Sequence, residues 1–486
     1  MGDEPALGLR FTVEVDAASD LAFDDDRVDA LLTVRARATP GAVNDAPTAE
    51  VLIMDKSLSM AGHGKLNEAK RAMCAAVDAV ADGSLLGIVA GHHTAEVIYP
   101  DSGGLARVDA AARAAAKYRV LDQFPEGGTA IGTWLACADR LFATVTARET
   151  VRHAVLYTDG KDEHETPEEL GRALAACADG FVCDARGLGD DWHYAELLRI
   201  TEALHGSAEA VVTVSDLTRD FTDLMARARR IVVPRVYLGL RVNSRFRLGF
   251  VRQTRPVEAD LTAQQQPHDD EIHIPLGSWP PEDRQYHVSL RFDPDALPVD
   301  EEQRAARITL RAERPDATRV PCARPEAVLV RRRATPDLPM RGPSAGLTRV
   351  ENLRELGMAM RACADAQQNE RFEEADRELR TALELAAVLG DAERLDLLRA
   401  IAVTGPDGRA RVRRDAPRGQ VQRLGLRSTR TGAPDADPIP APERQRPSRR
   451  RCPVCGTVTT AVRLQHCEEC GHAFGDGVDD APMDAV

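Results

Sequence analysis

The sequence predicts a multidomain protein built around a doubly wound α/β domain, and three observations lead to this class. The chain has 486 residues, 43% of them hydrophobic. Because a domain usually takes about 100 to 200 residues, two to four domains are expected. Residues 47–231 alternate apolar strand-like runs with helical patterns, whereas the flanking segments alternate polar and apolar residues with period two. We therefore expect a mostly parallel sheet with helices on both faces, flanked by antiparallel strands.

The elements of the α/β domain follow one another in a regular order. Strands are expected at 49–54, 85–90, 95–99, 153–157, 181–185 and 209–213. Helices are expected at 65–81, 108–120, 131–145, 166–178, 194–204 and 218–229. The helix at 166–178 opens with Thr166-Pro-Glu-Glu169, a pattern in which the first and last side chains satisfy free amide groups of the first turn.

The flanks of this domain have the pattern of half-buried strands. Strands are expected at 9–15, 27–35, 236–242, 246–251, 271–274, 286–292, 306–310 and 327–330. Their period-two alternation is typical of antiparallel sheets with one buried face. We predict one β-sandwich formed by residues 1–46 and 232–335, with the α/β domain inserted into it.

The C-terminal third changes character twice. Residues 343–403 return to a helical period, with Phe372, Ala375 and Leu379 on one face, and we expect a small helical module there. Residues 404–451 are rich in Pro, Gly and Ala and hold 13 Arg against five acids. This composition predicts a disordered Arg-rich linker. A cysteine-rich segment, 452–475, and an acidic tail, 476–486, follow it.

The cysteine pattern and the absence of a signal-peptide or membrane-span pattern predict a cytoplasmic protein. The net charge is -14, and four of the ten cysteines lie close together near the C-terminus, while the others are scattered. Such scatter does not suggest a disulfide framework. The first residues have no basic segment followed by an apolar run, and no run of about 18 apolar residues occurs later. We expect neither a signal peptide nor a membrane span.

Polar side chains follow three of the expected elements at the point where ligands bind in open α/β sheets. Asp55-Lys-Ser57-Leu-Ser59 comes directly after the first strand, Thr129 precedes a helix, and Asp159 follows the strand at 153–157. These residue types also occur in helix caps and turns. Together, however, they offer only hard oxygen donors, which suit Mg²⁺ or Mn²⁺ and not zinc or copper.

Asp55-x-Ser57-x-Ser59, Thr129 and Asp159, in this order and on these elements, resemble the metal-ion-dependent adhesion site of von Willebrand factor type A domains, which are Rossmann-like. The resemblance implies that the three hydroxyls bind the metal directly, while both carboxylates act largely through ordered water. It also implies an open coordination position that takes an acidic side chain of a protein partner.

The resemblance covers residues 47–231 and includes Met60, Gly128 and Gly160. It further implies a bacterial intracellular protein that works with an AAA+ ATPase or with kinase and phosphatase partners in stress or conflict systems. We expect no enzymatic activity, because no base is paired with the two serines by motif and no phosphate-binding glycine loop opens a helix. A metal-dependent hydrolase is the alternative.

The C-terminal cysteines form a second metal motif. Cys452-Pro-Val-Cys455 and Cys467-Glu-Glu-Cys470 are two Cys-x-x-Cys turns, and eleven residues separate Cys455 from Cys467. Four thiolates at this spacing predict a tetrahedral Zn²⁺ site and resemble a zinc ribbon. A redox pair is the rival interpretation of each turn. Together with the Arg-rich linker, the ribbon also leaves nucleic-acid binding as an alternative function.

Overall fold

The computed structural model describes most of the chain. The described residues are 8–22, 25–39, 47–147, 150–159, 162–189, 192–211, 214–231, 233–314, 316–333, 344–431, 449–451 and 458–460. The chain divides into two compact units, Met1–Asp435 and Ala436–Val486. In the second unit, the described residues form one antiparallel pair, β22 (Arg449–Arg451) with β23 (Val458–Thr460). All other helices and strands of the described residues belong to the first unit.

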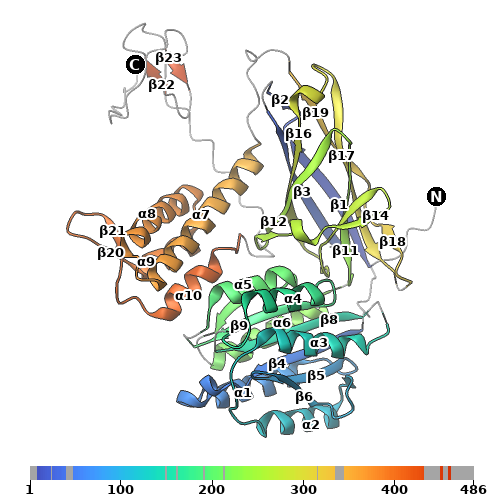
Figure 1. The fold of residues 1–486 in the computed structure, drawn as a ribbon, viewed down its shortest axis with the longest axis vertical. Helices are drawn as coiled ribbons and strands as arrows, with labels where there is room; N and C mark the ends of the chain where they lie inside the picture. Colours follow the sequence, from blue (N-terminus) through green and yellow to red (C-terminus); the bar gives the residue numbers. More distant parts are fainter. Residues whose placement is uncertain are drawn as a thin grey trace. The chain divides into compact units, whose positions relative to one another are not determined.

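The central sheet of this unit has the strand order β10-β9-β8-β4-β5-β6 (Figure 1). Its strands are β4 (Thr48–Asp55), β5 (Leu85–Gly91), β6 (Ala95–Tyr99), β8 (Val151–Thr158), β9 (Val182–Leu188) and β10 (Ala208–Val211), and β7 (Ala106–Arg107) pairs with β5. The strands from β10 to β5 are parallel, and β6 and β7 run antiparallel to β5. The predicted α/β domain is confirmed.

Helices cover both faces of this sheet. The helices are α1 (Lys65–Ala79), α2 (Ala110–Leu121), α3 (Ile131–Ala143), α4 (Pro167–Cys177), α5 (Tyr194–Ala203) and α6 (Val214–Arg229), and the short helix η1 (Leu58–Gly64) precedes α1. Leu52 and Met54 of β4 share a core with α1, α2 and α6, whereas Val51 and Ile53 share one with α3, α4 and α5. This division arises because successive strand side chains point to opposite faces. The predicted capping box at the start of α4 is also confirmed.

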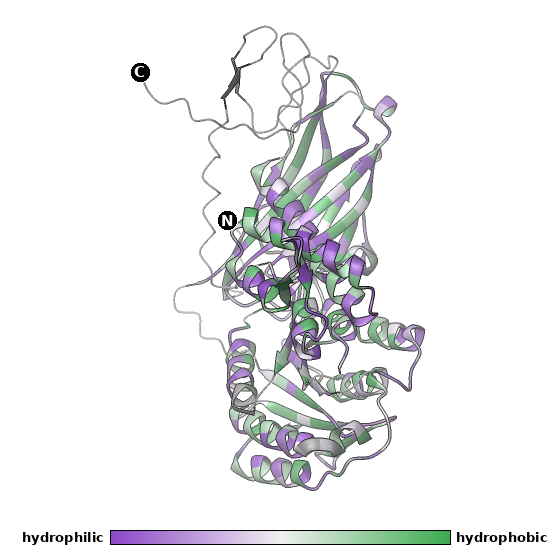
Figure 2. Cartoon of the chain, turned by 90° about the vertical axis from the view of Figure 1, so that its left-hand side faces the viewer, coloured by the Kyte–Doolittle hydropathy of each residue, from purple (hydrophilic) through white to green (hydrophobic). Residues whose placement is uncertain are grey.

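Strands from both sides of the α/β domain form two further sheets. Their orders are β1-β3-β16-β12-β13 and β14-β15-β11-β17-β19-β2, with β18 paired to β17. The bounds are β1 (Leu9–Ala17), β2 (Asp20–Leu21), β3 (Arg27–Ala38), β11 (Val236–Val242), β12 (Phe246–Arg255), β13 (Ala259–Asp260), β14 (Gln266–His268), β15 (Glu271–Pro275), β16 (Asp283–Phe292), β17 (Glu302–Glu313), β18 (Arg319–Pro321) and β19 (Glu326–Arg332). Both sheets contribute to one apolar core, and Figure 2 shows hydrophilic and hydrophobic residues alternating along the strands.

Three helices follow the sheets: α7 (Ala345–Gln368), α8 (Phe372–Leu389) and α9 (Ala392–Ala400). They lie within the range expected for the helical module. Ala375 and Leu379 of the predicted apolar face of α8 are buried. Over the described part of the chain, no helix is both long enough and apolar enough to cross a membrane.

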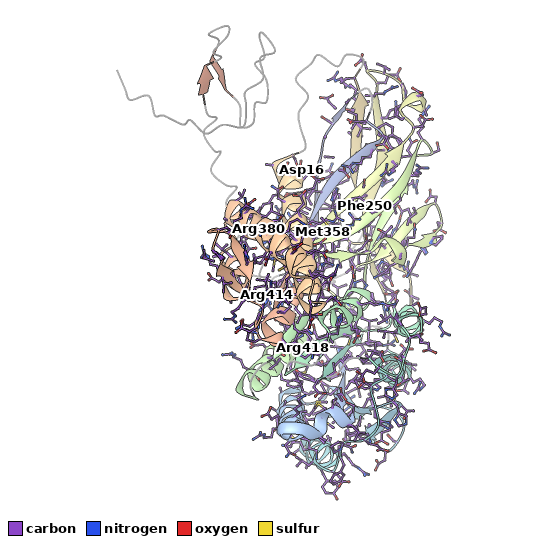
Figure 3. All side chains as sticks on the ribbon, turned by 60° about the vertical axis from the view of Figure 1, so that its left-hand side comes forward. Asp16, Phe250, Met358, Arg380, Arg414 and Arg418 are labelled. Carbon is purple, nitrogen blue, oxygen red and sulfur yellow. The ribbon has the colours of Figure 1, made fainter. Side chains whose placement is uncertain are left out.

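The prediction of a disordered linker from residue 404 is wrong for the described residues 404–431. β20 (Ala402–Thr404) pairs with β21 (Ala410–Val412), and α10 (Arg418–Arg427) follows. α10 buries Val421, Leu424 and Leu426, an apolar face that the Arg-rich composition concealed. The guanidinium of Arg414 (Figure 3) lies 4.6 Å from the centre of the Phe372 ring and ties this segment to α8.

Helix α10 is joined to the α/β domain by one side chain that makes two backbone hydrogen bonds. Gln422 is buried, and its amide nitrogen donates to the Trp192 carbonyl at 2.6 Å. Its amide oxygen accepts from the Tyr194 N–H at 3.0 Å. Tyr194 is the first residue of α5. The segment before α5 is therefore fixed to the helices that follow the sheets.

Candidate metal centre

The ends of β4 and β8 place two carboxylates at one edge of the central sheet. β4 ends at Asp55, and β8 ends at Thr158, directly before Asp159. Because the two strands are parallel, with Met54 opposite Tyr157, both ends reach the same edge. Asp55 and Asp159 are each 0% exposed. Two acidic residues without access to solvent require partners that stabilise their charge.

Hydroxyl groups are among those partners. The hydroxyl of Ser59 donates to Asp159 Oδ1 at 2.7 Å, and the Ser57 hydroxyl lies 2.8 Å from that of Ser59. Either serine hydroxyl can be the donor in the bond between them. The Ser57 N–H donates to Asp55 Oδ1 at 2.8 Å, and the Thr158 hydroxyl donates to Asp55 Oδ2 at 2.6 Å. Four of the five predicted metal residues thus belong to one continuous network.

The fifth predicted residue, Thr129, lies on the loop that enters α3. Two backbone bonds hold this loop against the segment after β4. The Leu58 N–H donates to the Gly127 carbonyl at 2.9 Å, and the Glu126 N–H donates to the Lys56 carbonyl at 2.7 Å. Thr129 itself is buried. These contacts bring Thr129 to the edge that carries the other four residues.

The electrostatics of this edge suit a hard cation. Burial raises the pKa of Asp55 to about 6, although hydrogen bonds from Ser57 and Thr158 lower it, and the nearby charge of Asp159 raises it further. Among the described residues, no group of three or more His, Cys, Asp or Glu side chains is arranged to hold a metal. A cation here would therefore depend on the hydroxyls as well as the carboxylates. Such an all-oxygen set fits Mg²⁺ or Mn²⁺.

One charged neighbour of the site was not anticipated from the sequence. The ammonium of Lys65, at the start of α1, lies 2.7 Å from Asp159 Oδ2. A signal was available, because a lysine at the first position of a helix sits at the positive end of the helix dipole, where acidic residues are favoured. Such a placement suggests a carboxylate partner elsewhere in the chain.

Exposed apolar side chains lie beside the same edge. Leu58, between the two serines, is 62% exposed. Phe124 is 71% exposed and stands three residues before Gly127, whose carbonyl contacts the Leu58 backbone. Tyr118 and Leu121, near the end of α2, are exposed as well. We call Leu58, Tyr118, Leu121 and Phe124 the apolar rim.

A different charged cluster lies toward the amino ends of the same strands. His153 of β8 is buried, with Nδ1 2.7 Å from Glu50 Oε2 and Nε2 2.9 Å from Asp184 Oδ2. Burial alone would lower the pKa of His153, but the two carboxylates raise it to about 10. The imidazole is therefore protonated at neutral pH. Asp184 also accepts hydrogen bonds from the backbone and hydroxyl of Ser207.

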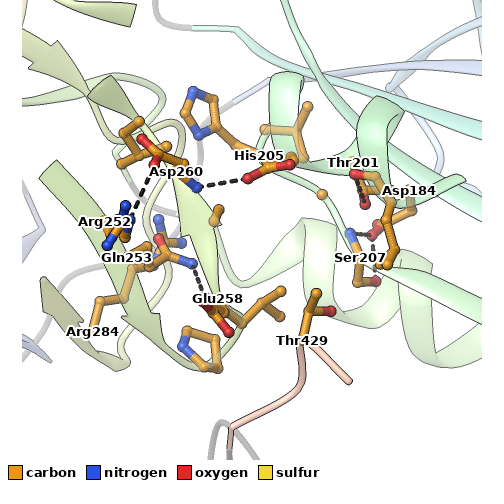
Figure 4. Close-up of a pocket in the computed structure, with 18 of the residues that line it drawn as sticks. Asp184, Thr201, His205, Ser207, Arg252, Gln253, Glu258, Asp260, Arg284 and Thr429 are labelled. Atoms are coloured by element: carbon orange, nitrogen blue, oxygen red, sulfur yellow. Dashed lines mark hydrogen bonds and ion pairs between the residues drawn. The ribbon is translucent and has the colours of Figure 1, made fainter. Parts of the chain in front are cut away.

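A cavity of about 600 Å³ adjoins this cluster, where the α/β domain, the β12–β13 segment and α7 meet. Figure 4 shows Arg252 paired with Asp260, and Ser207 bonded to Asp184. Arg252 lies 3.0 Å from Asp260, and Arg284 lies 2.6 Å from Glu282. These charges are paired with one another, whereas the oxygen ligands of the predicted metal site converge at the opposite edge of the sheet.

The second predicted metal site, formed by Cys452, Cys455, Cys467 and Cys470, lies outside the described residues. The Zn²⁺ ribbon and the acidic tail therefore stay predictions. The flanking pair of β22 and β23 brackets the first Cys-x-x-Cys turn in the sequence.

Comparison with known proteins supports the domain assignment. Residues 50–210 match the family model of the von Willebrand factor type A domain. The chain is similar to a solved structure described as von Willebrand factor type A from Catenulispora acidiphila, with 30% identity, a TM-score of 0.81, and coverage of 89% of this chain and 99% of that chain. No curated protein matches the chain.

A second solved structure, the ArnB paralog VWA2 from Sulfolobus acidocaldarius, has 16% identity and a TM-score of 0.52, and the alignment covers 86% of this chain and 98% of that chain. This level of identity supports the fold alone. The match to the Catenulispora protein extends over most of both chains, so it includes more than the α/β domain. The chain belongs to the von Willebrand factor type A family.

Proposed function

We propose that the chain captures an acidic side chain of a protein partner through a divalent cation, Mg²⁺ or Mn²⁺, held by Asp55, Ser57, Ser59, Thr129 and Asp159. One observation carries the proposal: two fully buried carboxylates are linked by serine hydroxyls at the ligand-binding edge of the sheet. Von Willebrand factor type A domains commonly mediate protein–protein interactions, which agrees with this role.

The carboxylates of the site orient the serine groups that would bind the cation. Asp55 orients the loop, because its carboxylate accepts the Ser57 N–H and so fixes the backbone between the two serines. Asp159 orients the Ser59 hydroxyl in the same way. A bound cation would supply Lewis acidity toward an incoming carboxylate. Since the hydroxyls are neutral, they leave the cation's charge incompletely balanced, which favours an anionic partner group.

The apolar rim supports a protein as the partner rather than a free small anion. Leu58 and Phe124 are mostly exposed beside the site. Exposed apolar side chains at a polar centre are typical of interaction surfaces. The partner surface would therefore present an acidic residue surrounded by apolar side chains. This combination gives specificity that a carboxylate alone does not have.

We propose further that the chain is not an enzyme and that it acts in the cytoplasm, with an AAA+ ATPase or a kinase or phosphatase as the partner class. The Cys452, Cys455, Cys467 and Cys470 ribbon would hold Zn²⁺ and dock a second surface. The absence of turnover on generic phosphoester and ester substrates would support the non-enzymatic role, whereas turnover that depends on Asp55 would favour the hydrolase alternative.

Metal binding can be tested directly on the full-length protein. Isothermal titration with Mg²⁺ should show a binding event that disappears in the double variant Ser57→Ala/Ser59→Ala. Lys117→Met, which removes an ion pair between Lys117 of α2 and Asp78 of α1, is the matched control and should bind Mg²⁺ normally. Equal Mg²⁺ binding by the serine double variant would contradict the assignment.

Partner capture needs a second experiment. Proteins retained by the wild type in Mg²⁺ should be released by a chelator and should not be retained by Asp159→Ala. Nucleic-acid binding predicts the opposite pattern, since retention would fall steeply with salt, survive Asp159→Ala and disappear when Arg444 to Arg451 are neutralised. A partner that binds the α/β domain equally well in chelator would show that the metal is structural.

A further inference from the structure

Lys65 places a positive charge next to the hydroxyl cluster. Its ammonium contacts Asp159 Oδ2 at 2.7 Å, while Asp159 Oδ1 accepts the Ser59 hydroxyl at 2.7 Å. A single carboxylate therefore joins the ammonium to the serines. A cation bound by those serines would lie within a few ångströms of a second positive charge. Like charges at such a separation repel more strongly near a protein surface than they do in bulk water.

Helix formation does not explain a lysine at this position. α1 begins at Lys65, directly after Gly64 in the left-handed conformation with φ of 75°. A lysine in the first turn opposes the helix dipole, so its placement costs stability unless an anion compensates. Asp159 is that anion, 94 residues further along the chain. The contact is thus a tertiary feature of the site and not a feature of the helix.

The side chain of Lys65 also has a route away from the carboxylate. It is 21% exposed, whereas Asp159 is fully buried. Lysine has a long, flexible stem, which lets its charged end move to solvent while the stem stays packed. A Cβ built on Gly189, after β9, would lie 3.8 Å from Lys65 Cε, so the end of that strand flanks the stem.

We propose that Lys65 is a tethered competitor of the divalent cation: its ammonium holds Asp159 in the metal-free protein and must withdraw when the metal binds. This inference rests on the metal binding proposed above. The proposal gives Lys65 two linked effects. The lysine lowers the affinity of the site for Mg²⁺, and it stabilises the metal-free protein by neutralising a buried carboxylate.

The opposite role would be orientation of Asp159, in which Lys65 holds the carboxylate ready for the metal. The two roles make opposite forecasts for the same variant. Removing a competitor strengthens Mg²⁺ binding, whereas removing an orienting group weakens it. Ser59 already holds Asp159 Oδ1, so the carboxylate keeps one fixed partner when the lysine is replaced.

The test is isothermal titration of the full-length protein with Mg²⁺, combined with thermal unfolding in chelator. Lys65→Met removes the charge, Lys65→Gln removes the charge but retains a hydrogen-bond donor, and Lys65→Arg retains the charge. We expect Lys65→Met and Lys65→Gln to bind Mg²⁺ about tenfold more tightly than the wild type or more, because one nearby like charge is lost. Lys65→Arg and the control Lys117→Met should bind as the wild type does.

Thermal unfolding gives the second readout. In chelator, Lys65→Met should unfold at a lower temperature than the wild type, and saturating Mg²⁺ should raise its midpoint by more than it raises that of the wild type. If Lys65→Met does not fold in chelator, Lys65→Gln provides the same comparison. This pattern is not expected from a lysine that serves only the helix, since Mg²⁺ would then raise both midpoints equally.

The outcomes separate this inference from the function on which it rests. Equal or weaker Mg²⁺ binding by Lys65→Met and Lys65→Gln, with binding still lost in Ser57→Ala/Ser59→Ala, overturns the competitor role alone. Mg²⁺ binding that is absent from the wild type, or unchanged in the serine double variant, overturns both. Tighter binding by both uncharged variants supports both.

Discussion

Two clusters of buried carboxylates lie toward opposite ends of the same strands, and they are neutralised in different ways. At the carboxyl edge, Asp55 and Asp159 are held by hydroxyls and by the partly exposed Lys65. Toward the amino edge, Glu50 and Asp184 enclose the protonated ring of His153, which is buried. Each cluster pairs its acids with hydrogen-bond donors that include one basic side chain.

The two clusters differ in whether the groups that neutralise their carboxylates can move away from them. Two carboxylates engage both nitrogens of His153, so the imidazole has no free ring nitrogen. Lys65 contacts Asp159 through a flexible, partly exposed stem, and the serine hydroxyls can turn toward a cation. A buried pair of carboxylates that is neutralised by an enclosed cationic side chain is structural. A pair whose hydrogen-bond and ion-pair partners can move away can accept a ligand. The following predictions test this distinction, beginning with the largest effect.

Replacing the enclosed cation should cost the most stability. His153→Gln removes the positive charge that contacts both Glu50 and Asp184, and breaking a buried ion pair in this way typically costs about 3–5 kcal/mol. Urea unfolding of the full-length chain followed by tryptophan fluorescence measures the loss, because Trp134 and Trp192 are buried in the α/β domain. Lys65→Met should lose less, because Asp159 keeps the Ser59 hydroxyl. Equal losses in the two variants would show that the clusters do not differ as described.

High pH should weaken the same cluster. The pKa of His153 is raised from its ordinary value of 6.5 to about 10 in the folded protein. Its contribution to stability is therefore fully present below pH 6.5 and is lost as the pH rises through about 10. Thermal unfolding between pH 7 and pH 10.5 should show a fall in midpoint for the wild type. His153→Gln should show a smaller fall over this range, and an identical fall would assign the effect to other groups.

Mg²⁺ should stabilise the carboxyl edge and leave the amino edge unaffected. At a free concentration of about 100 times Kd, a ligand that binds only the folded state adds about 2.7 kcal/mol. The increment should survive in His153→Gln and disappear in Ser57→Ala/Ser59→Ala. Differential scanning calorimetry with Mg²⁺ and with chelator measures it. An increment that disappears in His153→Gln would mean that the two clusters are coupled.

The smallest effect on stability is expected at the apolar rim. Leu58→Ser changes an exposed side chain, so the free energy of unfolding should change by less than about 0.5 kcal/mol. Mg²⁺ affinity should also stay the same, because the Leu58 contact to the Gly127 carbonyl is made by the backbone. Retention of the Mg²⁺-dependent partner should fall. Unchanged retention would exclude Leu58 from the partner surface.

The α/β domain could be predicted because its signals are local. β4 is a continuous apolar run ending in a carboxylate, and α1 repeats apolar residues at helical spacing. The five predicted metal residues were identified from their places after these elements, together with their resemblance to the adhesion site of von Willebrand factor type A domains. Neither the α/β domain nor the grouping of these residues at one edge depends on contacts between residues that are distant in the sequence.

The remaining features depend on contacts between distant residues. Periodicity places Lys65 at the start of a helix but does not indicate that its ammonium reaches Asp159. His153 was expected only as a strand residue, and its two carboxylates come from neighbouring strands at positions 50 and 184. The order of residues 404–431 was missed because α10 carries few apolar residues, and these bury against elements far away in sequence.

The bonds of Gln422 have a consequence for the order in which the protein can mature during synthesis. The Tyr194 N–H is one of the amide groups that a helix start leaves unpaired, and it finds its acceptor 228 residues later. A ribosome releases the α/β domain long before it releases α10. The Tyr194 N–H in the first turn of α5 therefore lacks its Gln422 acceptor while the α/β domain emerges. This hydrogen bond can form only after α10 has been translated.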